Sequence, residues 1–229
     1  VLKDIDLQVR NYRAVTEANP ARFKRRYRPT TGRVGLVYLA ENDWAPYVSY
    51  SQSFLPRSGD QFLALTVTQQ NLAPEKFTNY ELGTKWDVQP NLNLKLAVFQ
   101  LERSNATTPD PLNPLASINI GKTRTQGVEL AATGKITSLW QVHGGYSYQD
   151  AKLVGNNSVR LGQVPKQQAS LWNRYDLYPN FAVGLGIIHQ SSQFAAIRTT
   201  TNTTKLPAFT RIDAALFYDV SDTVQLQMN

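Results

Sequence analysis

The sequence predicts an all-β fold, a transmembrane antiparallel β-barrel with an up-and-down strand order. Apolar and polar residues alternate with a period of two over long segments, as they do in strands. The connections alternate between short turns and long loops, the pattern of outer-membrane barrels. Tyrosine and tryptophan gather near the ends of the expected strands, where such barrels carry aromatic girdles. In a Greek-key sandwich, long loops and short turns would not be expected to separate to opposite ends of the strands.

The composition rules out a helical membrane protein and leaves a membrane β-barrel open. The 229 residues include no cysteine, which excludes a disulfide framework and a thiolate metal site. No apolar run approaches the roughly 18 to 20 residues that a membrane helix needs. The strands of a membrane barrel alternate apolar and polar residues, so their mean hydropathy is low and long apolar runs are not expected. Because no signal peptide is visible and Val1 is not a natural start, we expect the chain to be part of a longer one.

Three strands are expected in the N-terminal quarter. Residues 1–10 alternate weakly, residues 33–40 end at a turn, and residues 44–54 alternate aromatic with polar side chains. A basic loop is expected between the first two strands, because residues 1–33 hold nine basic and three acidic residues, a local charge of +6. The cluster at 22–28 is either a site for an anion or a solvated loop. No groove-reading helix or RNA-binding motif accompanies it, so we expect no nucleic acid.

The clearest pair of strands spans residues 79–103 and turns at 89–91. In the first strand, one face carries Tyr80, Leu82, Thr84, Trp86 and Val88, and the other carries Glu81, Gly83, Lys85 and Asp87. In the second strand, Leu92, Leu94, Leu96 and Val98 alternate with Asn91, Asn93, Lys95 and Ala97. Both strands exceed the five or six residues that are usual in globular proteins. Apolar and polar faces of this length suit a wall with lipid outside and water inside.

Six further strands are expected after this pair, each bounded by turn-forming residues. They span 123–133, 139–149, 166–177, 181–190, 207–218 and 223–229, which brings the expected total to about eleven. Long loops are expected at 55–77, 104–121, 150–165 and 191–207, and short turns near 42, 90, 136, 179 and 221.

Nothing in the sequence supports catalysis, and we expect no enzyme, no resident cofactor and no metal site. His143 and His189 lack acidic or thiol partners at ligand spacing. The informative polar residues are charges of both signs on the expected inward face: Glu81, Lys85, Lys95, Glu129, Arg174, Arg211 and Asp213. Such charges are costly in a dry core but natural in a water-filled lumen or against another polar domain. We therefore expect cross-strand ion pairs among them.

A series of short segments resembles the mid-barrel strands of TonB-dependent siderophore receptors, in that family's order and spacing. The segments are GRVGLVY (32–38), WAPYVSYSQSF (44–54), LAPE (72–75), NYELGTKW (79–86), AVF (97–99), TQGVEL (125–130), GYSYQDA (145–151) and GQVP (162–165). The resemblance covers about residues 30–229. It implies a 22-stranded outer-membrane barrel around an N-terminal plug. Residues 1–229 would be the C-terminal portion of that barrel, without the plug and the final strand.

The resemblance also implies a function. A ferric siderophore would bind from outside, and the TonB complex would drive its import through the absent N-terminal part. We expect a monomer in the bacterial outer membrane, in contact with lipid and lipopolysaccharide, with its long loops extracellular. Ligand contacts are expected on loops and near the outer mouth, at Arg57, Gln61, Arg103, Arg124, Gln149, Arg160, Gln193 and Arg198. Arginine suits anionic, oxygen-rich ligands, and the class of siderophore stays open.

Two other functions are compatible with the sequence. A passive porin-like barrel would conduct ions without a plug or an energy source. A soluble β-rich carbohydrate-binding domain would use Trp44, Trp140 and Trp172 as stacking platforms and would need no detergent. An upstream plug would discard the porin, and the soluble domain predicts a core on the face that bears Trp86, Leu94 and Val142.

Overall fold

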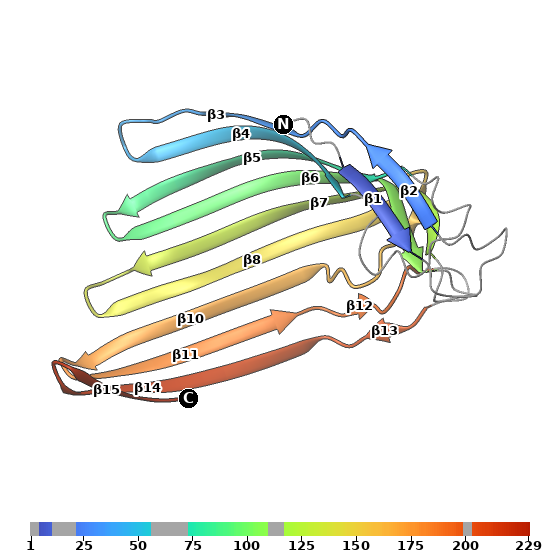
Figure 1. The fold of residues 1–229 in the computed structure, drawn as a ribbon. Helices are drawn as coiled ribbons and strands as arrows, with labels where there is room; N and C mark the ends of the chain where they lie inside the picture. The colour runs from blue at the N-terminus through green and yellow to red at the C-terminus, as the bar shows by residue number, and fades with distance from the viewer. Residues whose placement is uncertain (1–4, 11–21, 56–72, 110–116, 199–202) are drawn as a thin grey trace.

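The computed structural model describes residues 5–10, 22–55, 73–109, 117–198 and 203–229. All regular secondary structure in these residues is β-strand, which confirms the predicted all-β class. Figure 1 shows the strands side by side, with short turns at one end and long connections at the other. No helix in the described part is long and apolar enough to cross a membrane.

The main sheet is antiparallel and has eleven strands, ten of which follow one another in chain order. These ten are β3 (Gly32–Val37), β4 (Trp44–Leu55), β5 (Glu75–Gln89), β6 (Leu92–Pro109), β7 (Ser117–Lys135), β8 (Trp140–Leu153), β10 (Gln167–Tyr178), β11 (Phe181–Gln190), β14 (Phe209–Ser221) and β15 (Val224–Met228). The eleventh strand, β9 (Asn156–Arg160), pairs with the loop-side end of β8. Two separate ribbons pair β1 (Ile5–Arg10) with β2 (Arg22–Tyr27) and β12 (Gln193–Phe194) with β13 (Lys205–Leu206).

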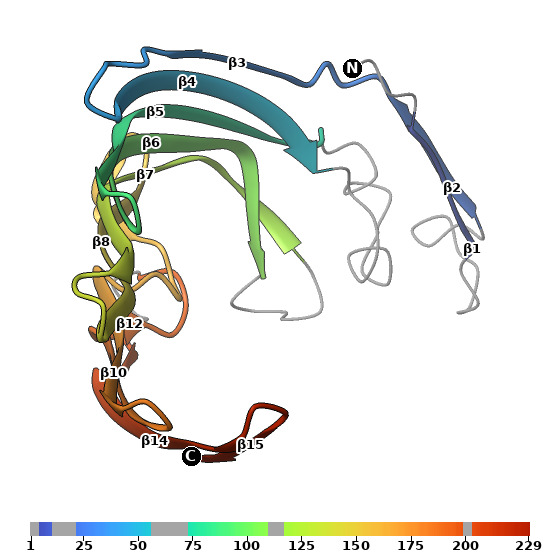
Figure 2. The ribbon, with the colours of Figure 1, turned by 90° about the vertical axis from the view of Figure 1, so that its left-hand side faces the viewer.

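The sheet is curved, so its two faces differ. Figure 2 looks from the short-turn end and shows an open arc with a concave and a convex face. Strand register aligns residues into rows across the sheet, and one convex row runs through Leu36, Val48, Leu82, Val98, Val128 and Tyr148. The residues one position along each strand point to the concave face. This alternation is the one predicted for the strands at 79–103.

The arc is a single layer of strands, and its buried apolar side chains are mostly alanines. Ala97, Ala106, Ala182 and Ala215 are buried within the sheet. On the convex face, by contrast, large apolar side chains stay exposed, among them Leu36 at 72% and Ile212 at 68%. A contiguous apolar surface of this kind is unfavourable in water. It suits the hydrocarbon of a bilayer, which is what the outside of a membrane barrel meets.

Several predicted loops contain strands instead. Strand β2 occupies part of the predicted basic loop, and β6 and β7 extend into the predicted loop 104–121. The predicted loop 150–165 holds β9, and the predicted loop 191–207 holds the β12–β13 ribbon. These predictions were wrong because strands that stand in water are polar on both faces, so the apolar alternation that marks a strand disappears.

The first predicted strand is also placed differently from expectation. Strand β1 lies within the predicted range 1–10, but it pairs with β2 and not with the main sheet. The main sheet therefore reaches eleven strands only through the short β9, which was not predicted. The predicted short turns near 42, 90, 136, 179 and 221 are all present.

Candidate functional site

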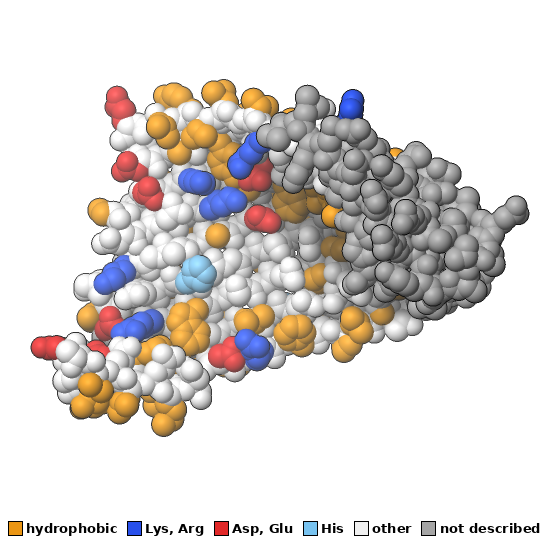
Figure 3. Space-filling view, in the orientation of Figure 1, with side chains coloured by type: hydrophobic (Ala, Val, Ile, Leu, Met, Phe, Trp, Pro, Cys, Tyr) orange, Lys and Arg blue, Asp and Glu red, His pale blue; other side chains and the backbone are white. Residues whose placement is uncertain are grey.

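The concave face carries the charged residues that the sequence placed on the inward side. Figure 3 looks onto this face and shows basic and acidic side chains gathered across its middle. Lys95 Nζ lies 3.7 Å from Glu81 Oε1 on the neighbouring strand, and the Tyr47 hydroxyl donates a hydrogen bond to the same carboxylate. This confirms one predicted cross-strand ion pair. The concave face is therefore polar and internally paired, as a wall around a wet interior requires.

Other charges on the concave face pair within one strand. Arg174 Nε lies 2.9 Å from Asp176 Oδ1, and Arg211 Nε lies 3.0 Å from Asp213 Oδ2. These partners are two residues apart, so they share a face of their strand. The Arg174 guanidinium also lies 4.6 Å from the centre of the Phe217 ring. Here the prediction of cross-strand pairs was wrong, because a partner two residues along the strand is within reach.

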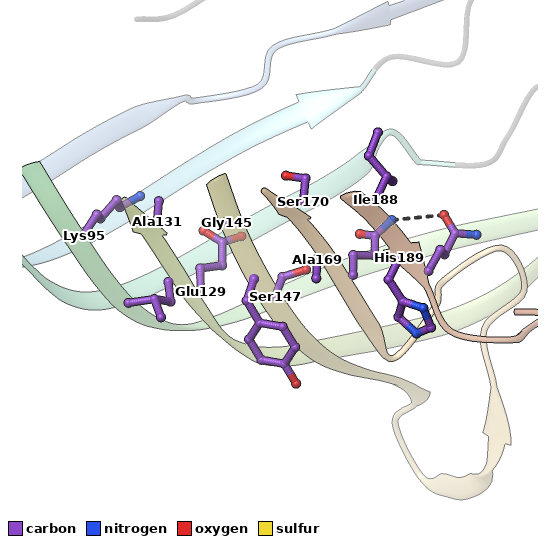
Figure 4. Close-up of a pocket in the computed structure, with 13 residues that line it drawn as sticks. Lys95, Glu129, Ala131, Gly145, Ser147, Ala169, Ser170, Ile188 and His189 are labelled. Carbon is purple, nitrogen blue, oxygen red and sulfur yellow. Dashed lines mark hydrogen bonds between the residues drawn. The ribbon is translucent and has the colours of Figure 1, made fainter. Parts of the chain in front are cut away.

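A hollow lies in the middle of the concave wall. The hollow has a volume of about 410 Å³. Figure 4 shows residues that line it, with Lys95 and Glu129 on one side and Ile188 on the other. The surface is depressed at Ala131 and Gly145, because these two lining residues have no large side chains. Strand register sets these two residues side by side on β7 and β8. The hollow can therefore receive side chains from a second polar body inside the arc.

The two histidines lie on opposite faces. His143 Nδ1 is 3.0 Å from Thr133 Oγ1 on the concave side, and His189 Nδ1 is 2.8 Å from Thr210 Oγ1 on the convex side. Among the described residues, no three His, Cys, Asp or Glu side chains come together as metal ligands. Each histidine has a threonine hydroxyl in a neighbouring strand as its hydrogen-bond partner, which accounts for the orientation of its ring.

At the loop end, the β8–β10 and β11–β14 connections lock together. The Gln163 amide donates to the Phe194 carbonyl at 2.7 Å, and the Arg198 amide donates to the Arg160 carbonyl at 3.0 Å. A Cβ on Gly162 would lie 2.4 Å from the Ala196 carbonyl carbon, so only glycine allows this approach. We call this region, residues 160–165, 193–198 and 203–206, the loop corner.

The loop corner concentrates positive charge on one aromatic ring. The Arg198 guanidinium carbon lies 5.6 Å, and Lys205 Nζ 5.3 Å, from the centre of the Phe194 ring. Both distances are in the range of cation–π contacts. On the opposite face of the β12–β13 ribbon, Gln193 Oε1 is buried without a hydrogen-bond partner. Two cations around a ring can hold a planar anionic group.

Four of the eight predicted ligand residues lie in or beside the loop corner: Gln149, Arg160, Gln193 and Arg198. Gln149 Nε2 donates to the Pro165 carbonyl at 3.1 Å, which ties the end of β8 to the corner. The sequence did not single out Phe194 or Lys205. Phe194 adjoins a predicted residue, but Lys205 approaches it only through the pairing of β12 with β13.

Arg103 lies elsewhere on the concave side, bound to a buried carboxylate. Arg103 Nη2 is 2.6 Å from Glu75 Oε2, and Glu75 itself is fully buried. The Thr107 amide and hydroxyl also donate to Glu75, at 3.2 and 2.7 Å. The β6 chain reaches this carboxylate through a bulge at Asn105, whose φ of 56° asparagine tolerates. The arrangement anchors the loop-side extension of β6 to the start of β5.

Arg124 and Arg160 project from the convex face, above the apolar rows. Arg124 Nη2 lies 2.7 Å from Glu102 Oε1, and Lys122 Nζ lies 2.5 Å from Glu102 Oε2. Hydrogen bonds from Lys122 and then from Arg124 hold the pKa of Glu102 below its ordinary value. We call Glu102, Lys122 and Arg124 the Glu102 triad.

A second triad of the same composition lies next to it. Asp150 accepts a salt bridge from Lys152 at 2.6 Å and another from Arg160. Burial raises the pKa of Asp150, but hydrogen bonds from Lys152 and Arg160 outweigh it, so the pKa lies below its ordinary value. We call Asp150, Lys152 and Arg160 the Asp150 triad. The two remaining predicted ligand residues, Arg57 and Gln61, fall outside the described residues.

Comparison with known proteins agrees with this architecture. Residues 3–229 match the family model described as TonB dependent receptor-like, beta-barrel. The chain is 30% identical over 240 residues to the probable TonB-dependent siderophore receptor PiuA of Acinetobacter baumannii, covering 96% of the chain and 32% of that protein. The ferrichrome outer membrane transporter/phage receptor of Escherichia coli strain K12 is 30% identical over 206 residues, 86% of the chain and 26% of the relative.

The likeness extends to three dimensions. The crystal structure of the siderophore receptor PiuA from Acinetobacter baumannii superposes with a TM-score of 0.79 at 28% identity, covering 94% of this chain and 33% of that one. The chain thus spans about a third of the length of the relatives it matches. With an all-β antiparallel arc, an apolar convex face and a family match over nearly its whole length, this chain belongs to the TonB-dependent receptor β-barrel family of the outer membrane.

Proposed function

We propose that the chain is the C-terminal barrel portion of an outer-membrane receptor that imports a ferric siderophore with energy from the TonB complex. The observation that carries this proposal is the contrast between the faces: an exposed apolar convex surface and an ion-paired polar concave wall. Such a wall encloses a wet lumen. The family match supplies the class of transport, and the relatives' names as receptors and transporters favour this reading over an enzyme.

The loop corner is the proposed ligand-contact region of this part of the barrel. Phe194, Arg198 and Lys205 offer two cations on one ring, on the face of the β12–β13 ribbon opposite to Gln193. Ferric siderophores are rich in oxygen and often anionic, and charge-assisted hydrogen bonds and cation–π contacts both suit them. The proposal places Arg57 and Gln61 among the further contacts, as the sequence predicted.

The concave hollow is the proposed seat of the plug that the sequence expects upstream. Small residues on its floor leave room for side chains of the plug, and Lys95 and Glu129 at its edge can exchange ion pairs with them. The TonB complex would act on that plug and not on this chain directly. When TonB releases the plug, the lumen that the plug had closed would become a path for the ligand.

Both alternative functions fit the structure less well. Strand alternation puts Trp44 and Trp140 on the convex face and Trp172 on the concave face, so the three rings cannot form one carbohydrate platform. A soluble domain would also expose the convex apolar rows to water. A passive porin shares the wall but needs no locked loop corner, and neither named relative is described as a porin.

Uptake of radioactive iron by cells that carry the full-length protein tests the proposal. Iron is presented on hydroxamate, catecholate and mixed siderophores, with and without a functional TonB complex. Uptake that requires TonB and one siderophore class supports the proposal and names the cargo. Absence of uptake with every siderophore, together with ion conductance in planar bilayers, would leave the porin in its place.

A further inference from the structure

The concave wall carries its charges differently on its two sides. On β5 and β7, charges of both signs stay free: among the described residues, Lys85 and Glu129 have no ion-pair partner. On β10 and β14, each arginine in the middle of the strand is neutralised by an aspartate two residues along, as Arg174 is by Asp176. Strand β11 between them has no Lys, Arg, Asp or Glu. A body that binds the wall through ion pairs therefore finds free charges on the first side and neutralised ones in the middle of the second.

Strand β11 is a low stripe that its neighbours cover. Its lumen-facing residues between the hollow and the short turns are Ala182, Gly184 and Gly186, and all three are buried. A Cβ on Gly184 would lie 2.5 Å from Trp172 Cζ2, and one on Gly186 would lie 2.6 Å from Cε3 of the same ring. These two carbons are on opposite sides of the six-membered ring. The half-buried indole of Trp172 therefore lies across β11 at both glycines.

Side chains from both flanking strands meet over the same stripe. A Cβ on Gly184 would also lie 3.2 Å from Phe217 Cε2 of β14, and the Arg174 guanidinium of β10 reaches the Phe217 ring at 4.6 Å. This part of the wall thus offers aromatic rings and ion pairs that are already satisfied, each a weak contact for a passing molecule. We call it the neutral wall and define it as Ser170, Trp172, Arg174, Asp176, Gly184, Gly186, Arg211, Asp213 and Phe217.

The loop corner stands at the loop end of the same three strands. Its segments 160–165, 193–198 and 203–206 lead into β10, follow β11 and precede β14, as Figure 1 shows. A ligand held there by Phe194, Arg198 and Lys205 would be at the head of the neutral wall. Passage through a pore requires contacts that admit a ligand but are weak enough to release it. The neutral wall meets this requirement directly below the loop corner.

The hollow proposed as the seat of the plug is charged on one side. Lys95 and Glu129 stand on β6 and β7, whereas Ile188 of β11 lies on the other side (Figure 4). A plug held by ion pairs would be bound more firmly to the charged side. It would part first from the side formed by β10 and β11, which is the side of the neutral wall.

We infer that release of the plug opens first along the neutral wall, that the ligand crosses the lumen there, and that Trp172 is its stacking contact midway. During the passage the plug keeps its contacts with β6 and β7. The inference rests on the proposed function and adds the route to it. The flat indole and the neutralised arginines guide planar, oxygen-rich groups without holding them.

The test compares two single cysteines in cells that carry the full-length protein with no other cysteine. Ser170→Cys places a thiol on the uncharged side of the hollow, and Ala131→Cys places one on the charged side. Both positions pair in register with Gly145, so they belong to one row across the wall. A small, membrane-impermeant thiol reagent is added during uptake of the ferric hydroxamate, catecholate or mixed siderophore that the parent imports, and again without the siderophore or without TonB.

We expect the thiol at position 170 to be labelled faster when siderophore and TonB are both present, and the thiol at 131 to be labelled at one rate in all conditions. Acceleration at both positions, or at 131 alone, would overturn the route. TonB-dependent uptake without acceleration at 170 would overturn the route and leave the proposed function standing. Absence of uptake by the parent would overturn both.

Two variants test the contact with Trp172. We expect Trp172→Ala to lower the maximal rate of uptake by about two- to tenfold, the range of one aromatic contact, and to leave the affinity for the ferric siderophore unchanged. Trp172→Phe keeps a ring over the stripe and should transport as the parent does. A parental rate in the alanine variant would remove Trp172 from the route. A loss of affinity as large as the loss of rate would make Trp172 a structural residue and would also overturn its role.

Discussion

Strands β6 and β7 are built differently on the two sides of the Gln100–Gln126 pair. On the turn side, the convex face shows Val98 and Val128, and on the loop side it shows Glu102 and Arg124. The backbone pairing is the same in both halves, with a bulge only beyond Arg103. The comparison shows that the outward side chains of a strand match their surroundings: apolar residues face lipid, and charged residues face water and headgroups.

The largest effect should come from a charge placed among the apolar rows. We expect Leu96→Arg to destabilise the folded barrel by about 2–4 kcal/mol, because a cation deep among the apolar rows loses its hydration. Unfolding of the full-length protein by urea in lipid vesicles measures this. The matched control is Gln100→Arg, on the same face at the boundary, for which we expect a cost below about 1 kcal/mol. Equal costs at the two positions would refute the lipid contact of the Leu96 row.

Loss of the buried ion pair should come next. In Arg103→Ala, the buried Glu75 carboxylate loses the Arg103 guanidinium but keeps the Thr107 donors. We expect a loss of about 1.5–3 kcal/mol, as for a hydrogen bond to a charged group. The comparison variant Arg211→Ala breaks an ion pair whose arginine is 63% exposed and should cost under about 1 kcal/mol. If both variants unfold at the same urea concentration, Glu75 does not anchor β6.

The loop corner offers a smaller, functional effect. We expect Phe194→Leu to weaken binding of the imported ferric siderophore by about five- to thirtyfold, because two cation–π contacts of about 0.5–1 kcal/mol each no longer hold Arg198 and Lys205. Phe194→Tyr keeps the ring and should bind as the parent does. Fluorescence titration with the siderophore that supports uptake measures both. A leucine variant with parental affinity would remove Phe194 from the ligand site.

The smallest effect should appear on acidification. The pKa values of Glu102 and Asp150 lie below their ordinary values in the folded protein, so their ion pairs stabilise it above about pH 4. This stabilisation is lost as the pH falls through the lowered pKa values. We expect less than about 1 kcal/mol, because the pairs are solvent-exposed. The Glu102→Gln/Asp150→Asn variant should lack this part of the pH dependence, and a parental slope in that variant would contradict the assignment.

The sequence predicted the membrane part of the fold well, because lipid imposes an alternation that is readable residue by residue. The faces of 79–103 and the short turns follow from that alternation. It predicted the loop side poorly. The β6 extension beyond Arg103, β9 and the β12–β13 ribbon have no apolar face to mark them.

The candidate site was predictable only in part. Arginine and glutamine in long loops indicated Gln149, Arg160, Gln193 and Arg198, of which the structure joins Arg160 to Arg198. The contact of Lys205 with Phe194 depends on a pairing between distant strands, which sequence spacing does not show. Likewise, the buried state of Glu75 results from a bulge in another strand.

The separation of faces is the central claim, and two neighbouring residues of β7 test it most directly. Leu130 lies on the convex face, and Ala131 lines the concave hollow. Because residues 1–229 contain no cysteine, Leu130→Cys or Ala131→Cys introduces a single reactive site in this part of the full-length protein. Each is labelled with a fluorophore and placed in vesicles that contain nitroxide-labelled lipid. The fluorophore at position 130 should be quenched and the one at 131 should not. Equal quenching at both positions, or the reverse order, would contradict a barrel wall with lipid outside and a lumen inside.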